Sequence, residues 1–286
     1  MAALFGPGGN SESFYAKGYK ATIDAPKFVW ESGLDAYEYE AGNGVTASEA
    51  TFAKIGQAAR QYGIHMTIHA PYYISLSSVD EEKRKKSADY ILSCAKALRG
   101  LSGDLMVIHP GSTAKLDRAV ALQYATESLE YALEVLQREG YYGVKLGMET
   151  MGKQNQLGTP DEIFELCKVD KTVVPVVDFG HMNARECGGV FNGADDYKRV
   201  FDRVAEHCGA EVAEHLHCHF SKIEYTKGGE KRHLTFADTV YGPEYEPLMR
   251  AIADLNVSPT VICESDGTMA EDARTMKEAY LRCKTV

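Results

Sequence analysis

The chain has 286 residues, of which 44% are hydrophobic and 25% charged, and its formal net charge is −10 at pH 7. This length and composition suit a single large globular domain over residues 1–286. The sequence has no basic, apolar leader and no run near the ~18 apolar residues of a membrane span, so we expect a cytoplasmic protein with no membrane partner. The negative charge argues against a general polyanion binder, because affinity for nucleic acids depends largely on neutralising phosphates.

Apolar runs bounded by turn residues predict eight β-strands along the chain. They are Ala2–Phe5, Asp35–Glu40, His65–Ala70, Leu105–His109, Val144–Glu149, Val174–Asp178, His215–Phe220 and Thr260–Glu264. Helical periodicity predicts helices in the segments between the strands and after the last one. They are Ser48–Tyr62, Glu81–Arg99, Arg118–Arg138, Asp161–Cys167, Asp195–Cys208, Glu244–Leu255 and Glu271–Leu281.

The alternation of strands and helices predicts an α/β fold with a parallel sheet. Several strands are nearly continuous apolar runs, which is typical of strands buried on both faces. The count of eight, together with the lack of a Gly-x-Gly-x-x-Gly turn after the first strand, favours a (β/α)8 TIM barrel over an open dinucleotide-binding sheet.

Residues of the types that bind metals come at the ends of successive predicted strands. They are His69, His109, Glu149, Asp178 and Glu264, and His217 lies within the segment His215–His219. All strands of a parallel barrel open on the same face, so these side chains are expected to converge there. Burying several imidazoles and carboxylates together is costly without cations between them, and the sequence therefore predicts a metal site at the C-terminal end of the strands.

Mixed imidazole and carboxylate ligands, without a Cys-x-x-Cys pair, indicate zinc, with manganese or iron as the other options. Two further histidines share a strand face with a predicted ligand, since His65 lies four residues from His69 and His219 lies two residues from His217. We expect them to hydrogen-bond to the ligands rather than to bind metal.

At these positions the chain resembles the endonuclease IV family of apurinic/apyrimidinic endonucleases, within the wider group of xylose isomerase-like barrels. The resemblance covers nearly the whole chain. It is most specific in Ile68–Leu76, Val107–Ser112, Met148–Gly158, Val177–His181, Leu216–Lys222 and Val261–Glu264. It implies an enzyme that holds three zinc ions and cuts DNA 5′ to an abasic site in base excision repair.

The resemblance also implies a ligand set for each ion. The first ion would be held by His69, His109 and Glu149. Glu149 would bridge to a second ion, completed by Asp178, His217 and Glu264, and a third would use His181 and His233. The carboxylates Glu149, Asp178 and Glu264 would then be the catalytic residues.

The chain departs from the family pattern at the third ion. The family has Asp-x-His there, whereas this chain has Lys231-Arg232-His233, with lysine at the place of the aspartate. Glu230, one residue earlier, is the candidate replacement. If Glu230 does not reach the ion, the third site is weak or fills only with substrate present.

The resemblance implies a DNA-binding role for Tyr72, which stands at the place of a tyrosine that wedges into the duplex. A basic group after the seventh strand, where phosphates would lie, is the second candidate for DNA binding. That group comprises Lys222, Lys227, Lys231 and Arg232. An aromatic residue packed on Tyr73, and a solvated charged loop, are the alternatives for these two features. The loop of residues 40–45 has no basic residue, although the family usually has a basic or glutamine wedge there.

Three functions remain open from the sequence. The first is a metal-dependent phosphodiesterase, acting as a monomer on DNA with abasic sites. The second is a metal-dependent sugar isomerase or epimerase of the same superfamily, which needs fewer histidines. The third is a catalytically silent metal-binding barrel. Five candidate histidines favour the first, and the acidic charge with the missing basic wedge favours the second.

Overall fold

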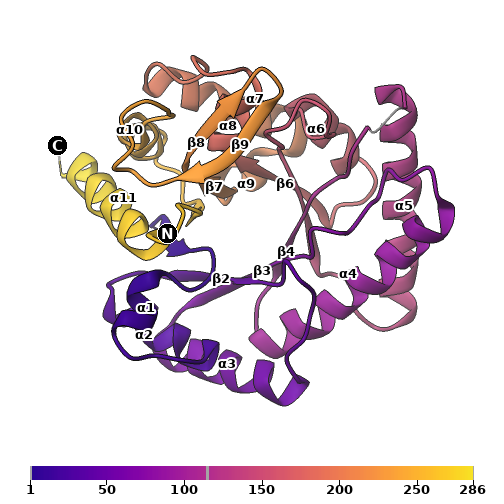
Figure 1. The fold of residues 1–286 in the computed structure, drawn as a ribbon, viewed down its shortest axis with the longest axis horizontal. Coiled ribbons are helices and arrows are strands. Elements are labelled where there is room, and N and C mark those ends of the chain that lie inside the picture. The colour runs from indigo at the N-terminus through magenta and orange to yellow at the C-terminus, as the bar shows by residue number, and fades with distance from the viewer. Residues whose placement is uncertain (1, 114–115, 286) are drawn as a thin grey trace.

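A computed structural model describes residues 2–113 and 116–285. Its main sheet has eight parallel strands in the order β1-β10-β7-β6-β5-β4-β3-β2. These strands are β1 (Leu4–Pro7), β2 (Ala36–Glu40), β3 (His65–His69), β4 (Leu105–Ile108), β5 (Lys145–Glu149), β6 (Val173–Asp178), β7 (His217–Phe220) and β10 (Thr260–Cys263). All eight predicted strands are present, and the bounds differ by at most two residues. The helices lie around the outside of the sheet (Figure 1).

The two ends of this strand order meet, which makes the sheet a barrel. Gly8 forms a parallel bridge with Glu38, and the amide of Gly9 donates a 3.0 Å hydrogen bond to the carbonyl of Glu38. Gly6 makes the close approach possible, because a Cβ atom there would lie 1.8 Å from the carbonyl oxygen of Ala36. The predicted (β/α)8 TIM barrel is thereby confirmed.

Seven helices correspond to the seven predicted from periodicity. They are α3 (Glu49–Tyr62), α4 (Glu81–Leu101), α5 (Arg118–Arg138), α6 (Pro160–Cys167), α8 (Ala194–Cys208), α10 (Tyr245–Leu255) and α11 (Met269–Lys284). The others are too short to show a helical period in sequence. They are α1 (Glu12–Ala16), the 3₁₀ helix Thr22–Asp24, α2 (Ala25–Glu31), α7 (Phe179–Arg185) and α9 (Ala210–Glu214). Over the residues described, none of the helices combines the length and hydrophobicity needed to span a bilayer.

A two-stranded antiparallel hairpin, β8 (Lys222–Thr226) and β9 (Gly229–Leu234), follows β7 and was not predicted. It packs beside α7 (Figure 1). It also contacts the loop after β5, because the amide of Glu230 donates a 3.0 Å hydrogen bond to the carbonyl of Gly152. The hairpin therefore stands at the C-terminal mouth of the barrel, next to the ends of β5 and β6.

Candidate metal centre

The polar residues at the strand ends come together at one mouth of the barrel. His69, Glu149 and Asp178 are the last residues of β3, β5 and β6. His109 and Glu264 directly follow β4 and β10. Since the strands are parallel, these five side chains arise at one level of the barrel, as the sequence predicted.

Glu149 lies at the centre of the cluster and is fully buried. Its Oε2 atom lies 3.4 Å from Nε2 of His69 and 3.0 Å from Nε2 of His109. Its Oε1 atom lies 3.3 Å from Nδ1 of His181 and 3.1 Å from Nδ1 of His219. Imidazoles therefore surround both carboxylate oxygens, which is an arrangement that lets one carboxylate serve two ions.

The charges of the cluster are strongly interdependent. Burial raises the pKa of Glu149, but the imidazoles of His219 and His109 outweigh it and hold this pKa well below its usual range. Burial lowers the pKa of His69, yet Glu149 and Glu40 raise it to about 10. The pKa of His219 is likewise raised by Glu264 and Glu38 against the effect of burial. Protons on imidazoles thus supply positive charge that divalent cations would otherwise provide.

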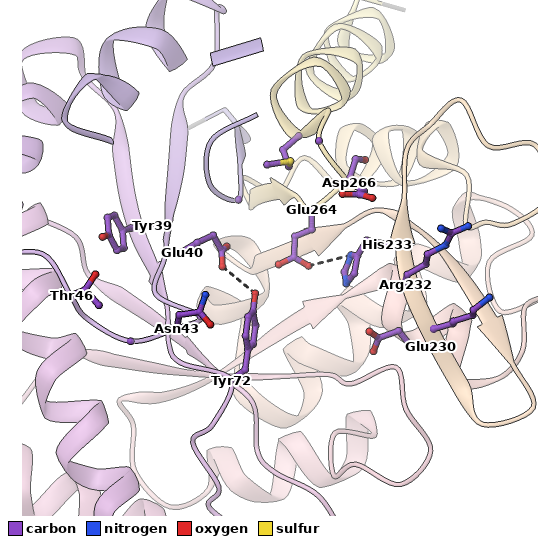
Figure 2. A pocket seen from close by; sticks show the side chains of 17 residues that line it. Tyr39, Glu40, Asn43, Thr46, Tyr72, Glu230, Arg232, His233, Glu264 and Asp266 are labelled. Atoms are coloured by element: carbon purple, nitrogen blue, oxygen red, sulfur yellow. Dashed lines mark hydrogen bonds and ion pairs between the residues drawn. The ribbon is translucent and has the colours of Figure 1, made fainter. Parts of the chain in front are cut away.

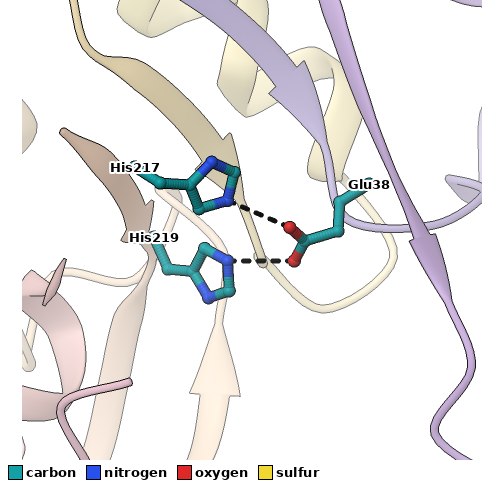
Figure 3. Close-up of side chains that lie close together, drawn as sticks. All are labelled: Glu38, His217 and His219. Atoms are coloured by element: carbon teal, nitrogen blue, oxygen red, sulfur yellow. Dashed lines mark hydrogen bonds and ion pairs between the residues drawn. The ribbon is translucent and has the colours of Figure 1, made fainter. Parts of the chain in front are cut away.

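The side chain that lies with Asp178 and Glu264 is His219, whereas the predicted ligand His217 lies in a separate set of donors with Glu38 and His219. Glu149, Asp178, His219 and Glu264 each place one donor atom within 4.8 Å of the others. His217 instead directs its Nε2 atom to Oε2 of Glu38, at 3.0 Å (Figure 3). The two histidines lie on the same face of β7, and His217, two residues earlier on the strand, lies deeper in the barrel.

A third set of donors comes from α7 and the hairpin. His181, Glu230 and His233 can also place donor atoms within 4.8 Å of one another, and Nε2 of His181 lies 3.5 Å from Oε2 of Glu230. Figure 2 shows Glu230 and His233 side by side on the hairpin. The geometry supports Glu230 as the replacement for the aspartate of the family pattern.

A β-bulge explains how Glu230 and His233 reach the same side of a strand. Glu224 pairs with Arg232 and Tyr225 pairs with Glu230, so Lys231 is an extra residue with no opposite partner. The bulge restores the side-chain alternation that a spacing of three residues would break. Lys231 need not act as a ligand, and its ammonium group pairs with Glu224 at 2.6 Å.

The donor set fits divalent metal ions. The Oδ2 atom of Asp178 is buried and has no hydrogen-bond partner among the described residues. The Nδ1 atoms of His69 and His181 hydrogen-bond to the carbonyls of Ala70 and Thr150, at 2.9 and 3.0 Å. These contacts leave Nε2 of each ring directed into the cluster, which is the usual arrangement of histidine ligands.

Other predicted site residues lie in different places. His65 does not support a ligand, because it pairs with Asp104 at 3.5 Å at the opposite end of β3. Lys222 is not available to DNA, because it is buried and its ammonium group donates to Glu244 and to the carbonyl of Asp238. Lys227 is exposed at the tip of the hairpin.

The rim of the site carries an exposed tyrosine and two cations. Tyr72 is 60% exposed, and its ring lies 5.6 Å from that of His109, whereas Tyr73 packs on Tyr90. Tyr72 also donates a 3.4 Å hydrogen bond to Glu40. The exposed Lys231 and Arg232 flank the site on the hairpin, and both pair with Glu224.

Two carboxylates of the site, Glu38 and Glu40, were missed from the sequence. Both lie on β2, and Glu38 is fully buried beneath His219. Burial raises the pKa of Glu40, which borders the mouth beside Tyr72. The available signal was two glutamates in a strand that a barrel would bury on both faces, which is a costly placement without nearby cations.

Two adjoining cavities open over the cluster. One, of about 410 Å³, is lined by the donors themselves, including His69, His109 and Glu149. The other, of about 790 Å³, lies between the loop after β2, the hairpin and the end of β10 (Figure 2). Tyr72, Glu230, His233 and Glu264 line both cavities, so a ligand in the larger one can reach the cluster.

The model of the xylose isomerase-like TIM barrel family matches residues 26–282. The chain belongs to this family. It is 35% identical over 249 residues to the uncharacterized protein MJ0133 of Methanocaldococcus jannaschii, covering 86% of this chain and 87% of the relative. It is 28% identical over 197 residues to a probable endonuclease 4 of Acholeplasma laidlawii, covering 66% of this chain and 62% of the relative. The relationship to endonuclease IV expected from the motifs is thereby confirmed.

Solved structures share the fold at lower identity. Endonuclease IV from Thermus thermophilus superposes with a TM-score of 0.72 at 18% identity, and each chain is 98% covered. A D-tagatose 3-epimerase-like protein superposes with a TM-score of 0.70 at 19% identity, covering 91% of this chain and 92% of the other. The fold is therefore common to nucleases and epimerases and does not distinguish them.

Proposed function

We propose that this protein is a metal-dependent phosphodiesterase of the endonuclease IV type, which cuts DNA 5′ to abasic sites. The observation that carries the proposal is the donor arrangement around Glu149. Imidazoles lie against both of its oxygens, and further sets of donors stand on either side of it. This is more ligand capacity than a single ion can use.

Divalent ions held ~3.5–4 Å apart activate water and stabilise the oxyanion that leaves in phosphoester hydrolysis. Zinc suits this mixed donor set, and manganese or iron would also be accepted. His69 and His109 would hold one ion with Glu149. Asp178, His219 and Glu264 would hold a second ion with it, and His181, Glu230 and His233 a third.

The chain's own groups would orient the DNA at this cluster. Tyr72 stands exposed at the edge of the mouth, where it can pack against the gap left by a missing base. Lys231 and Arg232 border the larger cavity and can contact phosphates. Glu149, Asp178 and Glu264 would set the net charge of the cluster.

The test combines metal counting with a defined substrate. The purified protein would be analysed for zinc, manganese and iron, and incubated with a duplex containing one abasic site. We expect more than one ion per chain, incision 5′ to the lesion, and loss of incision in Glu149→Gln. Glu130→Gln, on the exposed face of α5, makes the same chemical change away from the site and should cut normally.

A sugar isomerase or epimerase is the second candidate, favoured by the acidic lining of the larger cavity. Glu40, Glu264 and Asp266 line it, and the loop after β2 contributes no basic residue. Carboxylates of this kind can hydrogen-bond to sugar hydroxyls and move protons. One ion per chain, no incision and turnover of a ketose would replace the phosphodiesterase proposal with this one.

A further inference from the structure

A buried carboxylate, Glu38, lies directly beneath the cluster in the interior of the barrel. It is fully buried on β2, and three side chains meet its two oxygens. Thr67 donates to Oε2 at 2.8 Å, and Nε2 of His217 lies 3.0 Å from the same oxygen. Oε1 forms an ion-pair contact of 2.9 Å with Nε2 of His219 (Figure 3).

His219 links this carboxylate to the donors above it. While its Nε2 atom faces Glu38, its Nδ1 atom lies 3.1 Å from Oε1 of Glu149 and 3.3 Å from Oε1 of Glu264. A neutral imidazole has one protonated nitrogen and one with a free electron pair. Once Glu149 and Glu264 bind ions, Glu38 is the carboxylate that still faces the ring, so the proton stays on Nε2 and Nδ1 is left as the ligand.

The neighbours of Glu38 hold it in place for this task. Thr67 and His217 both engage Oε2, so the carboxylate is fixed at one end while Oε1 faces His219. In this arrangement His217 acts by holding Glu38 in place.

We propose that Glu38 is a positioning residue of the metal centre, which keeps the proton of His219 on Nε2 and so presents Nδ1 to the ion shared with Asp178 and Glu264. The inference rests on the metal centre of the proposed function and not on its DNA substrate. By this proposal, β2 contributes to metal binding through a buried carboxylate that orients a ligand rather than through a ligand of its own.

The first test measures zinc retention against a competing chelator in the full-length, zinc-loaded protein. Glu38→Gln keeps the size of the side chain but replaces one acceptor oxygen by a donor group. We expect the affinity for one ion to fall about 10–100-fold, with the other ions unaffected. Equal zinc affinity in Glu38→Gln and wild type would overturn the proposal.

His217→Gln is the matched control, because a glutamine amide can still donate to Glu38. We expect it to keep the full zinc content and affinity. If His217→Gln and Glu38→Gln each lose one whole ion, Glu38 and His217 are ligands themselves, and the positioning role is wrong.

A second measurement needs no variant and so does not depend on how Glu38→Gln folds. In zinc-loaded wild-type protein labelled with ¹⁵N-histidine, long-range NMR correlations report which ring nitrogen carries the proton. For His219 we expect a protonated Nε2 and a metal-shifted Nδ1, and the reverse pattern would refute the inference. Zinc binding without incision of abasic DNA would count against the proposed substrate alone, because no readout here depends on activity.

Discussion

Glu230 is the residue on which the proposed third ion depends most directly. It faces His181 and His233, and no other carboxylate of the hairpin does so, since Glu224 pairs with Lys231 and Arg232. We expect Glu230→Gln to lower the zinc content by one ion per chain and to leave two. Glu224→Gln, on the same hairpin, should keep the full content. Elemental analysis after gel filtration measures both, and an unchanged count in Glu230→Gln would remove Glu230 from the ligand set.

For single residues, the sequence indicates which strand carries a metal-binding side chain. It does not indicate as well how deep in the barrel that side chain lies. His217 and His219 are separated by one strand period and share a face, so alternation gives no reason to prefer either. How deep each histidine lies in the barrel depends on where β7 begins. His215 is the C-cap residue of α9, so β7 begins only at His217. His69, Glu149 and Asp178 are less ambiguous, because each strand has a single polar residue at its end.

The hairpin β8–β9 allows a prediction about a whole element, because its bulge accommodates the extra residue Lys231. Deleting Lys231 leaves Glu230, Arg232 and His233 as a regular strand with two donors two residues apart, and so on the same face. We expect this deletion to keep all the zinc ions. Deleting Lys231 and Arg232 together should place Glu230 and His233 on opposite faces and lose one ion.

Circular dichroism would establish that both deletion variants keep the barrel, and metal analysis would count their ions. Loss of an ion in the single deletion would show that the bulge is needed for more than side-chain alternation.

The elements that the sequence predicts well are those long enough to repeat a periodic pattern several times. Helix α5 (Arg118–Arg138) is found with its predicted bounds, because twenty-one residues show the apolar stripe clearly. The hairpin has no such pattern. Its second strand reads Gly-Glu-Lys-Arg-His-Leu, mostly polar, and it is held by pairing with β8 and by the carbonyl of Gly152, which a single sequence does not reveal.

For the whole molecule, metal removal should lower stability, and more so at high pH. Without metal, His69 binds a proton with a pKa of about 10, against 6.5 in the unfolded chain. A raised pKa stabilises the fold fully below pH 6.5, and this contribution is lost as the pH rises through about 10. Burial of Glu264 raises its pKa above 4.5 and so acts in the same direction.

We therefore expect the Tm of the chelator-treated protein to fall steeply between pH 6.5 and 10. The zinc-loaded protein should show a smaller fall, because ions replace these protons. Scanning calorimetry over this range measures both slopes. Parallel slopes would indicate that the cluster does not exchange protons for metal.

The net charge of −10 leads to a prediction about the salt dependence of DNA binding. Three cations, Lys153, Lys231 and Arg232, line the cavities over the cluster. Each phosphate contact contributes about −0.9 to the slope of log affinity against log salt, so we expect a slope near −3 for abasic DNA. Lys231→Ala should reduce its magnitude by about one. Fluorescence anisotropy at several salt concentrations measures the slope, and a value near −8 would require a much larger basic surface.

The donors of the proposed metal centre come from two kinds of element. Most donors stand on or next to barrel strands that the fold cannot lose, whereas Glu230 and His233 stand on an excursion of the chain between β7 and β10. A related barrel could shorten that excursion without disturbing its core. It would keep the strand-end ligands and lose one ion, and with it the chemistry that the extra ion supports. The length of this one connection would thus set how many ions a barrel of this kind can hold.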